Sequence, residues 1–532
     1  MAVPEKDSGS PKQHAGRAAA FTVALGIFLS RIAGLIRDRV FAHYFGNSDA
    51  ADAFRAAFRI PNFLQNLFGE GVLSASFIPV YARLNAEERH DEASEVAEAT
   101  FGLLFLTTSL LVVAGIFASP WLIDAIAPGF SGDKRLLTIR LVQILFPGAG
   151  ILVFSAWCLG ILNSHREFLL SYTAPILWNL AIIGAFFWRG GRETQSHLAV
   201  VVAWGSVVGS ALQFLVQLPS VLRFLWPLRI RVKFGSEHVH TVVKNFFPVF
   251  VSRGVVQISA YIDALLASFL PTGAVAALSY AQTLYSLPVS LFGMSVSAAE
   301  LPAMSSALGS TEEIAAALRQ RLASGLQHIA FFVVPSAAAF VFLGNVVVAT
   351  IYRSGQFTAR DVTYVWAVIA GSAVGLLAST SGRLYSSAFY ALRNTRTPLN
   401  FAVIRVALTL VLGYFFALPL PPLLHIDQRW GVAGLTLSAG IAGWVEFVLL
   451  RRALHRQIGV VPYSALRVVK MWLAAILAAG AGYGIKIALA GHGPVLVGFC
   501  VLVPYGLIYF AVTYWMGISA LDGLWRRLRG WL

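Results

Sequence analysis

The sequence predicts an all-α polytopic membrane protein with about fourteen transmembrane helices: two six-helix lobes followed by two appended C-terminal helices. Three observations predict this class. The 532 residues are 57% hydrophobic and 12% charged, with a mean hydropathy of +0.72, which excludes an ordinary soluble protein. Apolar runs long enough to cross a bilayer recur along the whole chain. Three short motifs of the first half reappear in the same order in the second half.

Apolar runs of about 20 residues or more define the predicted spans. They cover residues 18–45, 49–84, 95–127, 136–162, 168–188, 197–224, 241–270, 274–307, 315–351, 362–391, 397–419, 430–453, 464–489 and 494–517. Residues 1–17 form a polar tail, and no small-residue cleavage site follows it, so the first span is expected to stay as a helix. Cys158 and Cys500 both fall inside spans, so neither a disulfide framework nor a cysteine-ligated metal is expected.

The distribution of basic residues predicts that both termini are cytoplasmic. An even number of spans puts the termini on one side of the membrane. With the termini inside, the inner segments hold 22 Lys and Arg residues and the outer segments hold 7. The outer seven are Lys134, Arg135, Arg189, Arg192, Arg353, Arg360 and Arg429. The net charge of +15 is therefore attributed to topology and to contact with anionic lipids, not to nucleic acid.

An internal repeat divides the predicted spans. Ser30-Arg31 recurs as Ser252-Arg253, residues 67–79 are similar to 291–302, and the turn 162–166 is similar to 392–396, all at offsets of roughly 222 to 230 residues. Both halves begin with a helix of the same direction, so the repeat is parallel. The predicted domains are a tail (1–17), an N-lobe (18–224), a C-lobe preceded by a basic cytoplasmic loop (225–453), and the last two spans with a basic tail (454–532).

Charged residues concentrate in the first two spans, where a lipid-facing charge costs about 2.5–3.5 kcal/mol. One stripe of the second span steps by three or four residues, through Asp52, Arg55, Arg59, Asn62, Asn66 and Glu70. Arg31 and Asp38 share a face of the first span. Arg outnumbers acid here, which favours a polar interior that binds an anion. The alternative is that these charges neutralise one another inside a packed bundle. Pro61 is expected to kink the second span.

The second half has polar residues of its own. Arg253, Gln257 and Tyr261 step by four in the seventh span. The eighth span has a stripe of small and polar residues, which is more typical of close helix packing; it consists of Ser286, Ser290, Gly293, Ser297 and Glu300. Arg405 and Glu446 are predicted to form a structural pair between the eleventh and twelfth spans.

Motifs for catalysis are missing from the sequence. It has no P-loop, HExxH, CxxC or serine-hydrolase elbow, so we expect a transporter without an active site, cofactor or metal. His238 and His240 are interpreted as solvated residues of the loop after the sixth span. An enzyme of lipid metabolism is less favoured than a carrier, because mid-span Arg residues bind anions and do not exchange protons.

Four segments resemble the MurJ (MviN) family of lipid II flippases: SRIAGLIRD (30–38), DAADAFRAAFRIPNFLQNLFGEG (49–71), FIPVYARL (77–84) and FYALRNTRTP (389–398). The resemblance implies an alternating-access carrier of the multidrug/oligosaccharidyl-lipid/polysaccharide flippase superfamily. It implies that the carrier moves the undecaprenyl-pyrophosphate-linked peptidoglycan precursor from the inner to the outer leaflet of the cytoplasmic membrane. The last two spans would form a groove for the polyprenyl tail.

The resemblance also implies which residues line a central cavity between the lobes. It places Arg31, Arg37 and Asp38 there, with Asp52 and Glu70 in the second span. Together with the charge pattern, it gives a predicted substrate-binding set of Arg31, Arg37, Asp38, Asp52, Arg59, Glu70 and Arg253.

Two cations of the family pattern are replaced here. Many members have Arg where this chain has Gln65 and Asn66, and an Arg of the eighth span is replaced by Thr283. Arg59 and Arg253 are the candidates to compensate. Two other functions stay open: export of another lipid-linked oligosaccharide or amphipathic compound on the same fold, and a non-transporting scaffold. Anionic membrane lipids and cell-wall synthesis proteins are the other expected partners.

Overall fold

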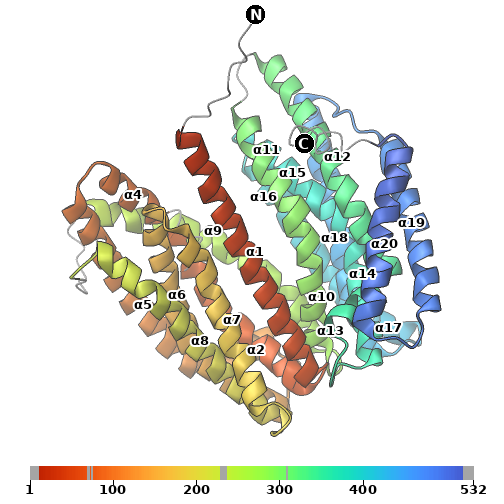
Figure 1. Cartoon of the computed structure of the whole chain (residues 1–532), viewed down its shortest axis with the longest axis horizontal. Coiled ribbons are helices and arrows are strands. Elements are labelled where there is room, and N and C mark those ends of the chain that lie inside the picture. Colours follow the sequence, from red (N-terminus) through yellow and green to blue (C-terminus); the bar gives the residue numbers. More distant parts are fainter. Residues whose placement is uncertain (1–10, 69–71, 74–75, 228–236, 307–309, 519–532) are drawn as a thin grey trace, which may run out of the picture. The chain divides into compact units, whose positions relative to one another are not determined.

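A computed structural model describes residues 11–68, 72–73, 76–227, 237–306 and 310–518, which are almost entirely helical (Figure 1). The described residues contain no strand, and a single isolated bridge among them pairs Ser354 with Phe357. The predicted all-α fold class is therefore confirmed.

Contacts divide the chain into two compact units: an N-unit (Met1–Phe45 and Asp49–Tyr261) and a C-unit (Gly46–Ser48 and Ile262–Leu532). The N-unit contains α1 (Pro11–Phe45), α2 (Asp49–Phe68), α4 (Ile78–Ala86), α5 (His90–Ile126), α6 (Gly132–Ser164), α7 (Phe168–Arg189), α8 (Gln195–Phe224) and most of α9 (Glu237–Ser268). The C-unit continues with α10 (Ala274–Pro288), the π-helix η1 (Val289–Met294), α11 (Ser295–Ser305), α12 (Thr311–Phe342), α13 (Gly344–Tyr352), α14 (Ala359–Val374), α15 (Leu376–Ala391), α16 (Arg396–Ala417), α17 (Leu420–Leu423), η2 (Gln428–Trp430), α18 (Gly431–Ile458), α19 (Ala465–Ala488) and α20 (Pro494–Trp515).

Each predicted span falls on one or more of these helices. Ten described helices are long and apolar enough to cross a membrane, and the bent pair α14–α15 makes up to eleven. The remaining three predicted spans fall on α1, α2 and α9. Helix α2 carries Asp52, Arg55 and Arg59 within its 20 residues, and parts of α1 and α9 lie outside the residues whose side chains are described. The number fourteen therefore stays a prediction.

The described part of the predicted span 49–84 contains α2 (Asp49–Phe68), which continues past Pro61, and α4 (Ile78–Ala86). Residues 69–71 and 74–75 between them lie outside the described residues, and the kink expected at Pro61 stays a prediction. The predicted span 315–351 is divided into α12 and α13 at Leu343.

A bend of 41° separates α14 from α15 at Gly375. A Cβ atom on Gly375 would collide with the backbone of Gly440 in α18, so glycine at both positions lets the two backbones touch. A Cβ atom on Gly293 in η1 would collide with the side chain of Thr380 in α15. This contact supports close packing as the role of Gly293 in the eighth predicted span.

The internal repeat is visible in the helix boundaries. Helix α6 spans 132–164 and the pair α14–α15 spans 359–391, an offset of 227 residues, and the helices that follow, α7 and α16, are both 22 residues long. The turn after each has the same hydrogen bonds: Arg166 N–H donates to Asn163 O at 3.1 Å, and Arg393 N–H donates to Tyr390 O at 2.9 Å. Both Arg residues have positive φ, 63° and 57°.

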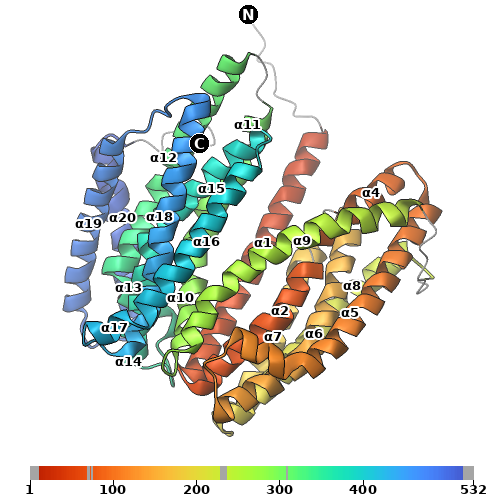
Figure 2. The same ribbon diagram turned by 180° about the vertical axis from the view of Figure 1, so that it is seen from behind.

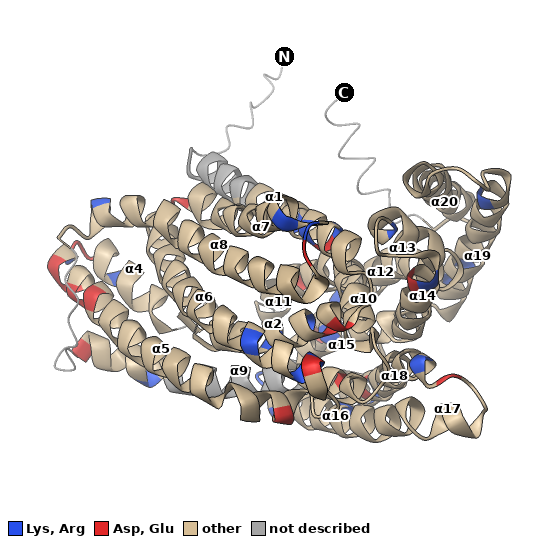
Figure 3. Ribbon diagram, turned by 90° about the horizontal axis from the view of Figure 1, so that it is seen from below, with Lys and Arg blue, Asp and Glu red and all other residues tan. Residues whose placement is uncertain are grey.

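Helix α6 is central to the N-unit, where it packs against α2, α5, α7 and α8. Gln213 and Gln217 of α8 donate to Ser155 Oγ of α6 at 3.0 and 2.6 Å. Such polar links inside an apolar bundle fix which residues of two helices meet. The middle turns of α5, α7 and α8 carry no charged residue (Figure 3), as expected of helices that face lipid or an apolar core.

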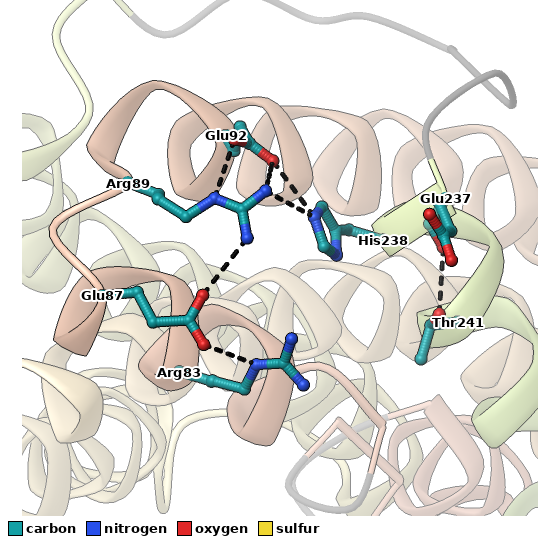
Figure 4. A network of polar contacts seen from close by, with 7 residues as sticks. All are labelled: Arg83, Glu87, Arg89, Glu92, Glu237, His238 and Thr241. Atoms are coloured by element: carbon teal, nitrogen blue, oxygen red, sulfur yellow. Dashed lines mark hydrogen bonds and ion pairs between the residues drawn. The ribbon is translucent and has the colours of Figure 1, made fainter.

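A polar network joins the α4–α5 turn to the start of α9 (Figure 4). Arg89 donates to Glu92 at 2.6 Å and to Glu87 at 3.2 Å, and Arg83 donates to Glu87 at 3.0 Å. His238 Nε2 lies 3.1 Å from Glu92 Oε2. The interpretation of His238 as a solvated loop residue was therefore wrong: it lies in the first turn of α9 and its side chain is only 22% exposed. His240 is exposed, but it too belongs to α9.

Candidate functional site

Ion pairs join the charged residues of α1, α2 and α6 in the N-unit. Asp38 Oδ1 accepts hydrogen bonds from Arg37 and from Arg55, each at 3.2 Å. Lys134 Nζ lies 2.6 Å from Asp52 Oδ2 and 3.0 Å from Asp49 Oδ1. We call these six residues the charge cluster: Arg37, Asp38, Asp49, Asp52, Arg55 and Lys134. It contains three basic and three acidic side chains.

The two central carboxylates of the charge cluster are buried. Asp38 is 4% exposed and Asp52 is 1% exposed. Removing an ionised carboxylate from water costs several kcal/mol unless a partner compensates it. The paired cations supply that compensation, so the interpretation that charges neutralise one another holds for Asp38 and Asp52.

Aromatic rings hold the basic side chains of the charge cluster in place. The Arg55 guanidinium lies 4.2 Å from the centre of the Phe41 ring, and Arg37 lies 5.1 Å from that of Trp178. Lys134 lies 4.4 Å from the Phe130 ring. Cation–π contacts stabilise a desolvated cation by about 2 kcal/mol, and here they add to the ion pairs.

The charge cluster sits near the helix ends that meet at the α1–α2 turn. Asp49 and Asp52 lie in the first turn of α2, and Lys134 lies near the start of α6. Arg31 and Arg59 lie farther from that turn: Arg59 is about 15 Å along α2 from its first residue, and Arg31 about 21 Å along α1 from its last residue. These two predicted site residues are therefore the deep cations of the N-unit.

The surroundings of Arg31 and Arg59 differ. Arg31 is exposed, and it has no ion pair or hydrogen bond with the side chains that the structure describes. Arg59 is half-buried, and its main-chain carbonyl accepts a hydrogen bond from the Tyr261 hydroxyl at 2.7 Å. Tyr261 belongs to the polar row predicted on the seventh span, so one residue of that row contacts the polar stripe of α2.

Two predicted site residues cannot be placed. Glu70 lies outside the described residues, and so does the side chain of Arg253, although its backbone belongs to α9. Thr283, at the position of a family cation, donates its hydroxyl to Ser279 O one turn earlier in α10 at 3.1 Å.

The C-unit has a separate set of polar contacts between its helices. Arg405 of α16 pairs with Glu446 of α18 at 3.1 Å, which confirms the predicted structural pair. The Tyr285 hydroxyl of α10 lies 2.9 Å from Ser379 Oγ of α15. Arg383, one turn after Ser379, is exposed.

Three residues of the charge cluster, Asp49, Arg55 and Lys134, were missing from the predicted site. Arg55 lies three residues after Asp52 in the polar stripe, and that spacing was the available signal. Lys134 was assigned to an outer loop, although it lies in α6 and contacts a residue 82 positions earlier. A single sequence has no signal for such a pairing. In chemical terms the arrangement offers a neutralised cluster near one end of α1 and α2 and two deeper guanidinium groups suited to an anion.

Comparison with known proteins gives consistent matches. A family model described as "Lipid II flippase MurJ" matches residues 41–504. A lipid II flippase MurJ of Burkholderia cenocepacia is 32% identical over 453 residues, which cover 82% of this chain and 84% of that protein. A probable lipid II flippase MurJ of Rhizobium meliloti is 30% identical over 524 residues, 94% of each chain.

Solved structures match over most of the chain as well. A lipid II flippase MurJ in an inward closed conformation superposes with a TM-score of 0.75 at 25% identity, covering 92% of this chain and 97% of the other. An inward-facing multidrug resistance transporter of the MATE family superposes with a TM-score of 0.63 at 17% identity, covering 82% and 98%. The second likeness shows the fold alone.

Proposed function

Because this chain belongs to the lipid II flippase MurJ family, we propose that it translocates lipid II, the undecaprenyl-pyrophosphate-linked peptidoglycan precursor. Translocation runs from the inner to the outer leaflet of the cytoplasmic membrane. The observation that carries this proposal is the continuity of the match, which includes most of both units in one family model, residues 41–504. A shared fold without that sequence match would support only a transporter of unspecified substrate.

The deep cations supply the anion-binding groups in this proposal. Arg31 and Arg59, with Arg253, bind the pyrophosphate through charge-assisted and often bidentate hydrogen bonds. Arg31 suits this role because it is exposed and has no carboxylate partner among the described side chains. The headgroup crosses along the polar faces of α1 and α2 while the polyprenyl tail stays in lipid, which avoids moving sugars and charge through hydrocarbon.

The charge cluster has a different role in this proposal. Arg37, Asp38 and Asp52 already have partners, so they form the polar wall of the pathway and hold α1, α2 and α6 together. Glu70, which lies outside the described residues, stays in the proposed set on the grounds of the sequence pattern. Access to the two leaflets alternates by movement of one lobe against the other, with both termini on the cytoplasmic side and basic residues there in contact with anionic lipids.

Complementation of a conditional lipid II flippase strain, combined with a leaflet assay for the precursor, tests the proposal. The expected result is rescue by the wild-type chain and loss of transport by Arg31→Ala at normal membrane abundance. Arg31→Lys keeps the charge but loses the bidentate geometry, so partial transport is expected. Arg192→Ala, which removes an exposed arginine in the α7–α8 turn, is the matched control and should transport normally.

Other functions give other results in the same assays. Export of a different lipid-linked oligosaccharide predicts no rescue and no movement of the precursor. A scaffold predicts rescue that survives Arg31→Ala. Normal transport by Arg31→Ala and by Arg59→Ala would contradict the proposed pyrophosphate site and leave the family assignment intact.

A further inference from the structure

A cavity of about 310 Å³ opens between α13, α14 and the α19–α20 hairpin of the C-unit. Figures 1 and 2 both show α13 beside the connected ends of α19 and α20. Its polar lining consists of Asn345, Arg353, Thr363, Lys486 and His492. No Asp or Glu belongs to the lining. We call this cavity the Arg353–Lys486 pocket.

The two cations of the Arg353–Lys486 pocket are not neutralised by the protein. Neither has a carboxylate partner within the part of the chain that the structure describes. Asp361 is the acid nearest to Arg353 in the sequence, but both of its carboxylate oxygens already accept hydrogen bonds from other groups. Its Oδ2 accepts from the Thr358 amide at 2.7 Å and from the Thr358 hydroxyl at 2.8 Å, and its Oδ1 accepts from Asn47 at 3.0 Å. The pocket therefore offers two positive charges to a ligand.

Most of the basic residues predicted on the outer side of the membrane are neutralised by an acid of the protein. Seven basic residues were predicted on the outer side of the membrane, and four of them have a carboxylate partner in the structure: Lys134, Arg135, Arg189 and Arg429. The positive-inside bias makes basic residues scarce on that side. An arginine and a lysine that converge there on one cavity, without an acid, are suited to an anion from outside the protein.

The rest of the Arg353–Lys486 pocket is apolar. Val346, Val362, Leu489 and Val497 line it beside the cations. Its volume is at the lower end of the range that holds small ligands. Cationic groups next to an apolar wall at a helix end match a lipid headgroup with the first part of its chain, because a free anion would leave the apolar wall unused.

The helices around the pocket are fixed against one another. Gly498 of α20 packs so closely on Thr350 of α13 that a Cβ atom there would collide with the hydroxyl. Farther along α20, the Tyr505 hydroxyl donates to Pro335 O at 2.6 Å and Tyr509 to Phe331 O at 2.7 Å, both in α12. A preformed site loses less conformational entropy when a ligand binds.

We propose that the Arg353–Lys486 pocket binds the phosphate headgroup of a lipid in the outer leaflet. The preferred lipid rests on the proposed function: it is the pyrophosphate-linked polyprenyl product after translocation, held until it leaves the protein. The phosphate of an anionic phospholipid has the same chemistry and is the other source.

Binding to the full-length chain in phosphatidylcholine nanodiscs tests this proposal. The probes are undecaprenyl pyrophosphate, phosphatidylglycerol and inorganic pyrophosphate, counted by native mass spectrometry. The double variant Arg353→Gln/Lys486→Gln should lose one bound lipid, with affinity for that lipid reduced about tenfold or more. The charge-preserving pair Arg353→Lys/Lys486→Arg should retain it, and Arg192→Gln, an exposed arginine outside the pocket, should bind as the wild type does.

Loss of undecaprenyl pyrophosphate alone supports the product as ligand, and loss of phosphatidylglycerol supports a phospholipid headgroup. Inorganic pyrophosphate should bind more weakly than either lipid, because it leaves the apolar wall empty. Unchanged binding of both lipids by the double variant, or equal loss in Arg192→Gln, would overturn the proposal. Arg31→Ala should leave this lipid bound, so a failure of the transport site is distinguished from a failure of the pocket.

Discussion

Asp52 illustrates how this chain keeps an ionised group inside a helical bundle. The side chain is 1% exposed, and Lys134 lies 2.6 Å from its Oδ2 atom. A buried pair gains little net stability, but loss of one partner leaves an uncompensated charge and destabilises strongly. Lys134 therefore matters because of the charge that its removal would leave behind.

Lys134 and its neighbour Arg135 allow a matched comparison. We expect Lys134→Gln to lower the free energy of unfolding by about 3–5 kcal/mol, because it breaks a buried pair. Arg135→Gln breaks an exposed pair with Asp124, whose side chain is 54% exposed, and should lower the free energy of unfolding far less than Lys134→Gln does, because solvent screens an exposed ion pair. Unfolding of the purified variants in detergent measures both values.

A rescue variant separates the effect of charge from that of packing. Asp52→Asn should restore much of the stability that Lys134→Gln removes, because it takes away the buried negative charge that Lys134 compensates. If the double variant is as unstable as the sum of the two single variants, the pair is not the cause.

The sequence allowed us to predict which residues are buried or charged, but not most contacts between residues far apart in the chain. The cost of burying Asp38 and Asp52 could be foreseen from their place in apolar spans, and so could the pair of Arg405 with Glu446. The partner of Asp52 could not, because Lys134 was assigned to an outer loop and lies 82 positions away in the sequence. Arg59 was predicted from the spacing of the polar stripe, and Arg31 from its depth, from the repeat and from the family resemblance.

The bend between α14 and α15 shows what helix prediction missed at the scale of elements. The length of the apolar run predicted a single continuous span over residues 362–391. The bend lies at Gly375, where the backbone of α18 comes too close for any side chain. In the first half of the repeat the equivalent helix, α6, stays continuous and has Pro147 near the matching place. A bend of this kind depends on a tertiary contact, which the local sequence does not contain.

The network between the α4–α5 turn and α9 should make stability depend on pH. The hydrogen bond from Arg89, with a further contribution from Arg83, holds the pKa of Glu87 below its ordinary value of 4.5. Glu87 lowers the free energy of the folded state only while it is ionised, so this contribution is present above pH 4.5 and is lost as pH falls through the lowered pKa. Glu87→Gln should lower the unfolding temperature at pH 7 and match the wild type at lower pH.

Glu88→Gln is the control for this measurement. Glu88 is an exposed neighbour for which the described residues provide no ion pair, so its replacement should change the unfolding temperature equally little at every pH. A gap between wild type and Glu87→Gln that persists well below pH 4 would rule out the ion pair as its cause.

The whole molecule was largely predictable, because fold class in a membrane protein follows from the length and order of apolar segments. The turns of the repeat match at Arg166 and Arg393, so the predicted pairing of 162–166 with 392–396 was three residues out of register. The number of spans stays a prediction, because the charged residues of α2 lower the mean hydropathy of that helix. The Arg353–Lys486 pocket combines residues more than 130 positions apart and could not be foreseen.

Cysteine labelling tests the predicted orientation of the whole chain. Cys158 and Cys500 are first replaced by alanine. In that background Arg192→Cys, in an outer turn, should react with a membrane-impermeant reagent in intact cells, and Arg166→Cys, in an inner turn, should react only after the membrane is opened. Both positions are exposed. The reverse pattern would invert the topology.

The pairing of Asp52 with Lys134 also has a consequence for how the protein is made. Ribosomes deliver α2 to the translocon well before α6 is synthesised, so during that interval Asp52 has no Lys134 to pair with. A carboxylate without that partner disfavours release into lipid, so we expect α2 to enter the lipid only once Lys134 of α6 is available. The charge cluster is thus expected to set the order in which these helices insert.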